Sequence, residues 1–267
     1  MINESLYNEM CNEFFPVFKK LAATDVYSIT LGGSYGKGKT DQGSDFDFRI
    51  YFDNWAEKDI VRSASEEVKR LVEKWKAKGV KVDGVWPRTY ADVDEQLEVW
   101  FAGKGALVQL EWSIWGYNIL TDIYNQQIIE DLYSKAALWK EKLSVYPEPL
   151  KKSILSRYVS SLKYWRNDYH YSSKVNRKDI VFLASITARL VQDIVQAVYA
   201  LNEFYYPGDG MNLEYSQQFA LKPRDFEERV ATLLRTSQSD DTYIIQYNNM
   251  IKLIDDTLSL VENNYKL

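Results

Sequence analysis

The chain has 267 residues, 46% of them hydrophobic, and a formal net charge of −5, which suits one large domain or two modest ones with filled cores. The acidic balance provides no basic surface for a polyanion, so we expect neither DNA nor RNA as a partner. No apolar run reaches transmembrane length and no basic segment followed by an apolar one marks the N-terminus, so we expect a cytoplasmic protein without membrane contact.

The first expected elements are a helix and a buried strand. Apolar residues recur at helical spacing over residues 6–21, although Pro16 inside this run predicts a kink or a late start. The apolar run over residues 26–31 then predicts a strand. A turn, Gly33-Ser34, follows directly, and its backbone N–H groups and hydroxyl can approach a phosphate closely.

Two carboxylates lie one residue apart in the next expected strand, over residues 45–52. Because side chains alternate across a strand, Asp45 and Asp47 share one face while Phe46 and Phe48 point into a core. Oxygen ligands of this kind suit Mg²⁺, which takes its remaining ligands from water and substrate phosphates. The sequence therefore predicts that phosphate, metal and acid meet beside the turn.

A second motif overlaps these residues. Residues 33–40 satisfy the P-loop pattern G-x-x-x-x-G-K-[ST], which taken alone predicts a nucleotide site. A P-loop has to open directly into a helix, whereas Thr40 is followed by a polar segment and a phenylalanine-rich strand, so we reject this motif. A solvated strand face is the simpler alternative for Asp45 and Asp47. The neighbouring glycine-serine turn favours a site instead.

A crossover helix and a third strand come next. An apolar stripe over residues 60–75 predicts a helix that ends near Gly79. Valines alternate over residues 80–85 and predict a strand with Asp83 on its polar face. Further along we expect a short helix over residues 93–101 and a possible strand over residues 108–115, which contains Glu111.

From about residue 120 onward, helical runs replace the alternating pattern. We expect helices over residues 154–165, 180–206, 223–236 and 240–264. The second of these has so many apolar positions that it should be buried on several sides. The C-terminal half is therefore predicted to be a helical bundle.

The single cysteine and the single histidine limit the chemistry. Cys11 excludes an intrachain disulfide and a cysteine metal cluster, and its apolar surroundings predict a packed thiol. His170 cannot form a histidine metal cage, and its polar, tyrosine-rich surroundings predict an exposed loop residue.

Gly33 and Ser34, followed about ten residues later by Asp45 and Asp47, resemble the signature of the nucleotidyltransferase superfamily with the DNA-polymerase-beta-like fold. The loop between them and the helix-rich C-terminal half are similar to the aminoglycoside and lincosamide nucleotidyltransferases and their uncharacterised bacterial relatives. Weaker similarity to the end of the helical domain in those relatives lies in Ala200-Leu201-Asn202, Tyr206-Pro207-Gly208 and Lys222-Pro223.

The resemblance implies an α+β fold with two consecutive domains. A small mixed-sheet nucleotidyltransferase domain would span residues 1–120, and an all-α helical domain that binds the substrate would span residues 121–267. A two-metal site in the first domain needs a third carboxylate from a neighbouring strand. Asp83 is the better candidate, because it follows the crossover helix and lies on a polar face. Glu111 is the competitor, and it is also a candidate general base.

The implied reaction is transfer of a nucleoside monophosphate from a nucleoside triphosphate to a hydroxyl group. Mg²⁺ would be held by Asp45, Asp47 and Asp83, and Ser34 would hold a phosphate oxygen. Lys37 and Lys39 are candidates to neutralise pyrophosphate, although lysines in a polar loop are often simply solvated. ATP as the donor follows only from the resemblance.

The acceptor is open at this point. The acidic charge and the many aromatic residues favour a small cationic molecule such as an aminoglycoside or lincosamide antibiotic, which would make the enzyme a resistance factor. The alternatives are an enzyme that modifies a protein or RNA, and a non-catalytic nucleotide-binding protein. The sequence does not indicate an oligomeric state.

Overall fold

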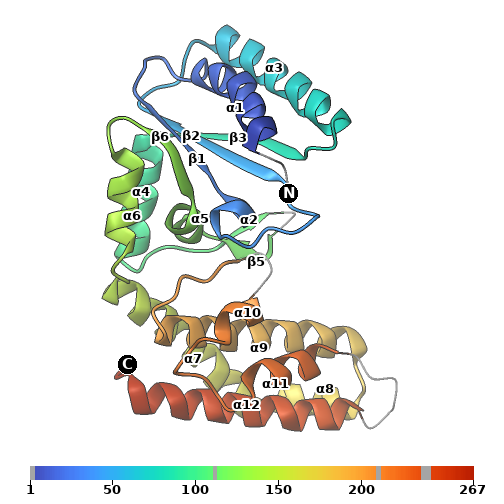
Figure 1. Cartoon of the computed structure of the whole chain (residues 1–267). Helices are drawn as coiled ribbons and strands as arrows, with labels where there is room; N and C mark the ends of the chain where they lie inside the picture. The colour runs from blue at the N-terminus through green and yellow to red at the C-terminus, as the bar shows by residue number, and fades with distance from the viewer. Residues whose placement is uncertain (1–3, 111–112, 209–211, 236–241) are drawn as a thin grey trace. The chain divides into compact units, whose positions relative to one another are not determined.

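The computed structural model is described for residues 4–110, 113–208, 212–235 and 242–267 (Figure 1). Contacts within the chain divide it into two compact units. The sheet unit consists of Met1–Val99 and Ile119–Val145, and the helical unit consists of Trp100–Asn118 and Tyr146–Leu267. The chain thus passes between the units after Val99, Asn118 and Val145, whereas we had expected one boundary at residue 120.

The sheet unit is built on a four-stranded sheet with the strand order β3-β2-β1-β6. Its strands are β1 (Tyr27–Leu31), β2 (Phe46–Phe52), β3 (Val82–Thr89) and β6 (Gln127–Asp131). β2 and β3 run parallel and are joined by helix α3 (Lys58–Ala77), while β1 is antiparallel to both β2 and β6. The predicted α+β fold with a small mixed sheet is confirmed.

Strand β6 corrects the expectation that no strand follows residue 120. It lies at the edge of the sheet, where its side chains are half-buried or exposed. Its register with β1 also shifts between Ile29 and Thr30. A short edge strand needs no strict apolar alternation, because neither face is fully covered, and so its sequence carries no clear period of two.

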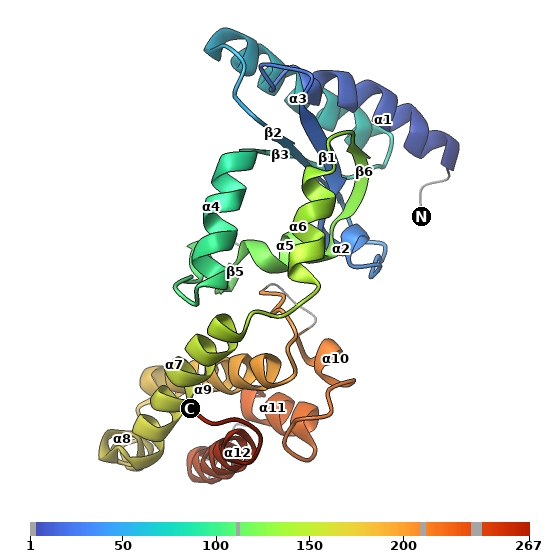
Figure 2. The same ribbon diagram turned by 90° about the vertical axis from the view of Figure 1, so that its left-hand side faces the viewer.

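One face of the sheet is apolar, and α1 (Glu4–Lys19) and α3 lie side by side on it (Figure 2). Helix α1 begins at Glu4 and continues through Pro16, so the proline does not delay its start. Cys11 is buried in this core, which confirms the packed thiol. The side chains that β2 contributes here are at most 3% exposed, namely Phe46, Phe48, Ile50 and Phe52.

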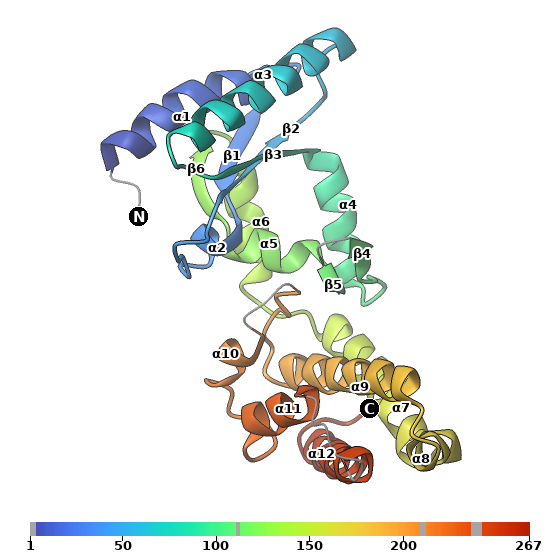
Figure 3. The ribbon, with the colours of Figure 1, turned by 90° about the vertical axis from the view of Figure 1, so that its right-hand side faces the viewer.

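The opposite face of the sheet is polar and is covered by three helices (Figure 3). These are α4 (Tyr90–Phe101), α5 (Ile119–Asn125) and α6 (Lys135–Leu143). The strand side chains on this face pair with groups of the covering segments: Ser28 Oγ lies 2.8 Å from the Tyr90 hydroxyl. Thr30 and Tyr51 both donate to Gln126 Oε1, over 2.6 and 2.9 Å. Each buried strand hydroxyl thus has a partner, which removes the cost of burying it.

The helical unit contains six described helices and a short hairpin. The helices are α7 (Glu148–Asn167), α8 (Tyr169–Asn176), α9 (Ile180–Leu201), α10 (Asn212–Ser216), α11 (Phe226–Leu234) and α12 (Thr242–Asn264). Strands β4 (Val108–Leu110) and β5 (Ser113–Tyr117) form the hairpin. His170 is exposed as expected, but it lies in α8 rather than in a loop, because Asp168 caps that helix by accepting from the His170 N–H.

Helix α9 is the core of the helical unit. Among the described residues it is the one helix long and apolar enough to span a membrane, and 56% of its apolar window is buried inside the protein. Two polar side chains of this helix have partners: Gln192 donates to the Trp115 carbonyl over 2.8 Å, and Asp193 accepts from Ser161 over 2.6 Å. Burial and paired polar groups are typical of a core helix.

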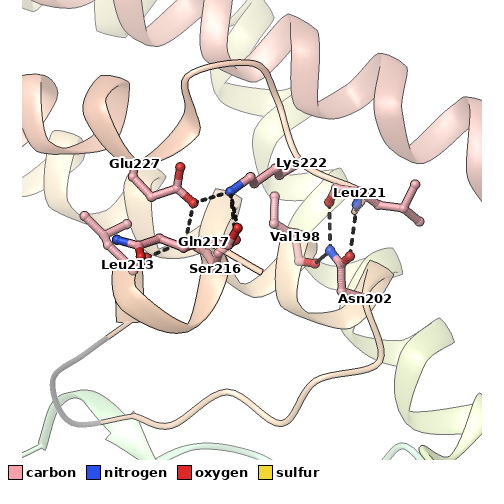
Figure 4. Close-up of polar contacts among 8 residues, drawn as sticks. All are labelled: Val198, Asn202, Leu213, Ser216, Gln217, Leu221, Lys222 and Glu227. Carbon is pink, nitrogen blue, oxygen red and sulfur yellow. Dashed lines mark hydrogen bonds and ion pairs between the residues drawn. The ribbon is translucent and has the colours of Figure 1, made fainter. Parts of the chain in front are cut away.

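Two polar side chains connect the segment after α10 to its neighbours (Figure 4). Asn202, at the end of α9, accepts from the Leu221 N–H over 3.0 Å and donates to the Leu221 carbonyl over 2.7 Å. Lys222 donates to the Ser216 carbonyl over 2.9 Å and to Glu227 Oε1 over 2.7 Å. The stretches 200–202 and 222–223, singled out in the sequence, therefore contribute to a structural latch between α9, α10 and α11.

Candidate active site

The turn after β1 is held close to β2. The Gly32 N–H donates to the Asp47 carbonyl over 2.8 Å, which extends the pairing of the two strands into the turn. Gly33 and Ser34, expected as a turn, are the first two residues of the one-turn helix α2 (Gly33–Gly36), and the segment from Lys37 to Asp45 contains only turns and irregular structure before β2. No long helix starts there, so the rejection of the P-loop motif is confirmed.

Gly33 is required by its contact with Asp47. Its φ of +56° lies in the left-handed region, which favours glycine. A Cβ atom on Gly33 would lie 1.7 Å from Asp47 Oδ2, a distance no real contact allows. The backbone of the turn and the carboxylate therefore approach each other as closely as a glycine permits.

Ser34 supplies a polar atom that the protein does not use. Its Oγ atom is buried, and no hydrogen-bond partner is present for it. A buried hydroxyl without a partner costs free energy, which a ligand oxygen placed beside it would recover. Ser34 follows Gly33 directly, so this hydroxyl belongs to the same turn that contacts Asp47.

Three aspartates influence one another at the start of β2 and β3. Asp47 pairs in register with Gly84, so Asp83 lies on the neighbouring strand next to Asp45 and Asp47. Burial raises the pKa of Asp47 to about 6; Arg49 opposes this rise, and Asp45 and Asp83 add to it. Partial loss of hydration and the Asp45 carboxylate raise the pKa of Asp83 as well. The repulsion among these carboxylates favours a cation between them.

A buried ion pair lies on the same face as Asp47. Arg49 is 8% exposed, and its Nε and Nη2 atoms contact the two carboxylate oxygens of Asp122 over 3.0 and 3.2 Å. Its Nη1 atom donates to the Phe48 carbonyl over 3.2 Å and lies 3.9 Å from Asp47 Oδ1. Burial alone would lower the pKa of Arg49, but the Asp122 carboxylate more than reverses this effect, so the guanidinium is charged.

The sequence analysis did not identify Arg49 or Asp122 as site residues. Arg49 carries a usable signal, because it lies two residues after Asp47 on a strand face that the pattern leaves polar. Asp122 carries no such signal in the sequence, since it lies 73 residues from Arg49 and resembles any acidic residue on a helix surface. Only the folding of α5 against β2 brings the two together.

The remaining predicted site residues are two lysines and Glu111. Lys37 is half-buried and Lys39 is exposed, both in the segment that follows α2. Asp41 orders the later part of this segment by accepting from the Gly43 N–H over 2.7 Å. Glu111 falls outside the residues that the structure describes, so the choice between Asp83 and Glu111 stays a prediction.

The donor set fits a divalent cation of the hard, oxygen-binding type. Asp45 and Asp83 raise the pKa of Asp47, and Asp45 raises that of Asp83, so the three carboxylates lie near enough to repel one another. Within the described residues, no three acidic, histidine or cysteine side chains lie together as a group that could hold a metal ion. Mg²⁺ takes several of its ligands from water and substrate oxygens, so one or two carboxylates are enough protein ligands for it.

Comparison with known proteins agrees with this geometry. Residues 11–138 match the family described as a nucleotidyltransferase domain. Residues 112–210 match a domain of unknown function, DUF4037. No curated protein matches the chain. The first match ends inside α6, beyond the expected boundary at residue 120, and so includes α5, β6 and Asp122.

Proposed function

We propose that the protein is a Mg²⁺-dependent enzyme that transfers AMP from ATP to a hydroxyl of a small molecule, because residues 11–138 match the nucleotidyltransferase domain family. One observation carries the proposal: the Gly33-Ser34 turn lies against Asp47, with no room for a Cβ atom between them. This contact brings a phosphate-binding backbone and an acidic cluster to one point, as transfer between a polyphosphate and a hydroxyl requires.

In the proposed reaction the acceptor oxygen attacks the α-phosphorus, the bond from that phosphorus to the pyrophosphate oxygen breaks, and the acceptor proton passes to a base. Asp45, Asp47 and Asp83 would hold Mg²⁺, which when bound stabilises the developing negative charge and lowers the pKa of the hydroxyl. The buried Ser34 hydroxyl would donate to a phosphate oxygen. Glu111 remains a candidate for the base.

Lys37 and Lys39 would neutralise the departing pyrophosphate. Lys37, which is half-buried, is the better placed of the two to contribute a fixed charge, because an exposed lysine such as Lys39 remains hydrated. The two lysines should therefore differ in their effect on the rate.

We assign the acceptor to an aminoglycoside or lincosamide, with the helical unit as its binding element. The net charge of −5 supports attraction of a cationic drug. Aromatic side chains of the helical unit offer surfaces for its rings, and the exposed ones include Tyr164 and Tyr169. A resistance role in the cytoplasm would follow from this acceptor.

The test is to incubate the protein with Mg²⁺ and ATP labelled at the α-phosphate, together with a panel of these drugs. We expect label on at least one drug, no transfer by Asp45→Asn, and normal transfer by the matched control Asp53→Asn, an exposed aspartate that directly follows β2. A second arm offers cell protein and RNA extracts instead of drugs. Label only on protein or RNA would overturn the small-molecule acceptor, and no transfer to any acceptor would overturn the enzyme.

A further inference from the structure

Arg49 is the group that could block the acidic cluster. It is a buried guanidinium whose Nη1 atom lies 3.9 Å from Asp47 Oδ1, just beyond hydrogen-bond length. An arginine this close to a carboxylate ordinarily forms a two-point pair with it. Such a pair would use one lone pair on each oxygen of Asp47 and place a positive charge against the carboxylate, so it would compete with a cation.

Asp122 prevents that pairing. It binds the Nε and Nη2 atoms of Arg49 over 3.0 and 3.2 Å, which uses the side of the guanidinium suited to two-point binding. The Phe48 carbonyl accepts from the remaining Nη1 atom over 3.2 Å. Arg49 therefore approaches Asp47 only through the 3.9 Å contact of its Nη1 atom, and it affects Asp47 by its charge without a hydrogen bond.

The backbone leaves room for this arrangement at Gly32. A Cβ atom there would lie 2.9 Å from Asp122 Oδ1 and 3.1 Å from Arg49 Nη2. Any larger residue would push the ion pair away from the turn or open it. The missing side chain of Gly32 thus leaves space for the Arg49–Asp122 pair, as that of Gly33 leaves space for Asp47.

We infer that Asp122 is a positioning residue: by holding Arg49, it keeps both oxygens of Asp47 free for a divalent cation. The inference rests on the proposed function, because it assumes that Asp47 is a metal ligand. It assigns to Asp122 a role at the site without contact to nucleotide or acceptor. It also explains why a strongly basic side chain lies beside a metal site without neutralising it.

The test measures binding of Mn²⁺ in the presence of a non-hydrolysable ATP analogue, from the electron paramagnetic resonance signal of free Mn²⁺. Asp122→Asn keeps the volume but weakens the hold on Arg49, so we expect Mn²⁺ affinity to fall by about 10- to 100-fold. In Arg49→Met/Asp122→Asn no guanidinium remains to occupy Asp47. We expect this double variant to recover affinity to within about threefold of the wild type.

Tyr51→Phe is the matched control, because Tyr51 lies next on the same face of β2 and donates to Gln126 rather than to the acidic cluster. It should lower thermal stability and leave Mn²⁺ affinity unchanged. Equal affinity in the wild type and Asp122→Asn would overturn the inference but not the proposed function. A double variant no better than Asp122→Asn would also overturn it, since loss of structure alone would explain both. No Mn²⁺ uptake by the wild type would overturn both proposals.

Discussion

Gly33 connects backbone conformation to the chemistry of Asp47 more directly than any other described residue. Its φ of +56° and the 1.7 Å approach of a hypothetical Cβ atom to Asp47 Oδ2 are separate demands on one position. The first concerns strain in the turn, and the second concerns the placement of a carboxylate. To separate the two effects, a substitution at Gly33 needs a control variant that introduces the backbone strain but does not displace a carboxylate.

Gly33→Ala should lower the rate of nucleotidyl transfer by about 100-fold or more, because the added methyl group displaces the Asp47 carboxylate by about 1 Å. The matched control is Gly79→Ala, whose φ of +79° is also positive but whose Cβ atom would meet nothing within 4 Å. Both variants should lose about 1 kcal/mol of stability from backbone strain, and only Gly33→Ala should lose the transfer rate. Equal rates in the two variants, measured with their unfolding curves, would contradict this role for Gly33.

Asp47 should make stability depend on pH. Because burial raises its folded-state pKa from the ordinary 3.8 to about 6, the folded protein binds this proton more tightly than the unfolded chain. Without divalent cations, the contribution of Asp47 to the free energy of unfolding should therefore fall as the pH rises from about 4 to about 6, and stay level above that.

Asp47→Asn removes this dependence and should be more stable than the wild type by about 1–3 kcal/mol near pH 7. The difference should vanish below about pH 4, where both side chains are neutral. Urea unfolding of both proteins across this range measures it. An asparagine variant that is less stable than the wild type near neutral pH would show that Arg49 outweighs the cost of burial.

At the scale of elements, the latch around α10 is a structural role for a motif that the sequence associated with relatives. Asn202 replaces a missing backbone partner for Leu221 by both accepting and donating, and Lys222 satisfies carbonyl oxygens at the end of α10. Neither side chain belongs to the sheet unit, which contains the acidic cluster. The motif therefore requires no catalytic explanation.

Asn202→Ala should destabilise the protein by about 1–3 kcal/mol, because it leaves the Leu221 backbone groups unpaired in a partly buried place. Asn264→Ala is the control, since Asn264 also donates to a carbonyl four residues earlier in its helix but is exposed. The control should cost less than about 0.5 kcal/mol. Thermal unfolding compares the two variants, and an equal loss of stability would show that the Asn202 contacts with Leu221 do not stabilise the helical unit.

At the scale of the whole molecule, the order of the units along the chain matters for folding. The sheet unit is completed by α5, β6 and α6, which follow a segment that belongs to the helical unit. The late segments carry the partners of buried groups on β1 and β2, namely Asp122 for Arg49 and Gln126 for Thr30 and Tyr51. The sheet unit therefore cannot finish folding before the ribosome has synthesised these late segments.

A fragment of residues 1–145 should therefore unfold cooperatively in urea, whereas a fragment of residues 1–120 should not. The shorter fragment loses β6 and leaves the buried Arg49 charge without Asp122, which costs about 3–5 kcal/mol in addition to the lost packing. Circular dichroism with urea titration measures the difference. Cooperative unfolding of the shorter fragment would show that the sheet unit folds stably without α5, β6 and α6.

The sequence by itself determined those features that depend on neighbours along the chain. Alternation in residues 45–52 placed Asp47 opposite the phenylalanines, and the apolar stripe over residues 60–75 marked the crossover helix, because the periods of strands and helices are local. The Gly33-Ser34 turn and its spacing to Asp45 likewise indicated the nucleotidyltransferase domain family that residues 11–138 match.

The tertiary structure alone decided what depends on contacts between distant segments. Strand β6 became a strand by pairing with β1, and Asp122 became part of the site by reaching Arg49 across 73 positions of sequence. The division into two units likewise depends on which distant segments pack together, and the boundary expected at residue 120 separates Asp122 and Gln126 from the strand residues that they bind. Such pairings carry no period in either segment, so they follow only from the folded chain.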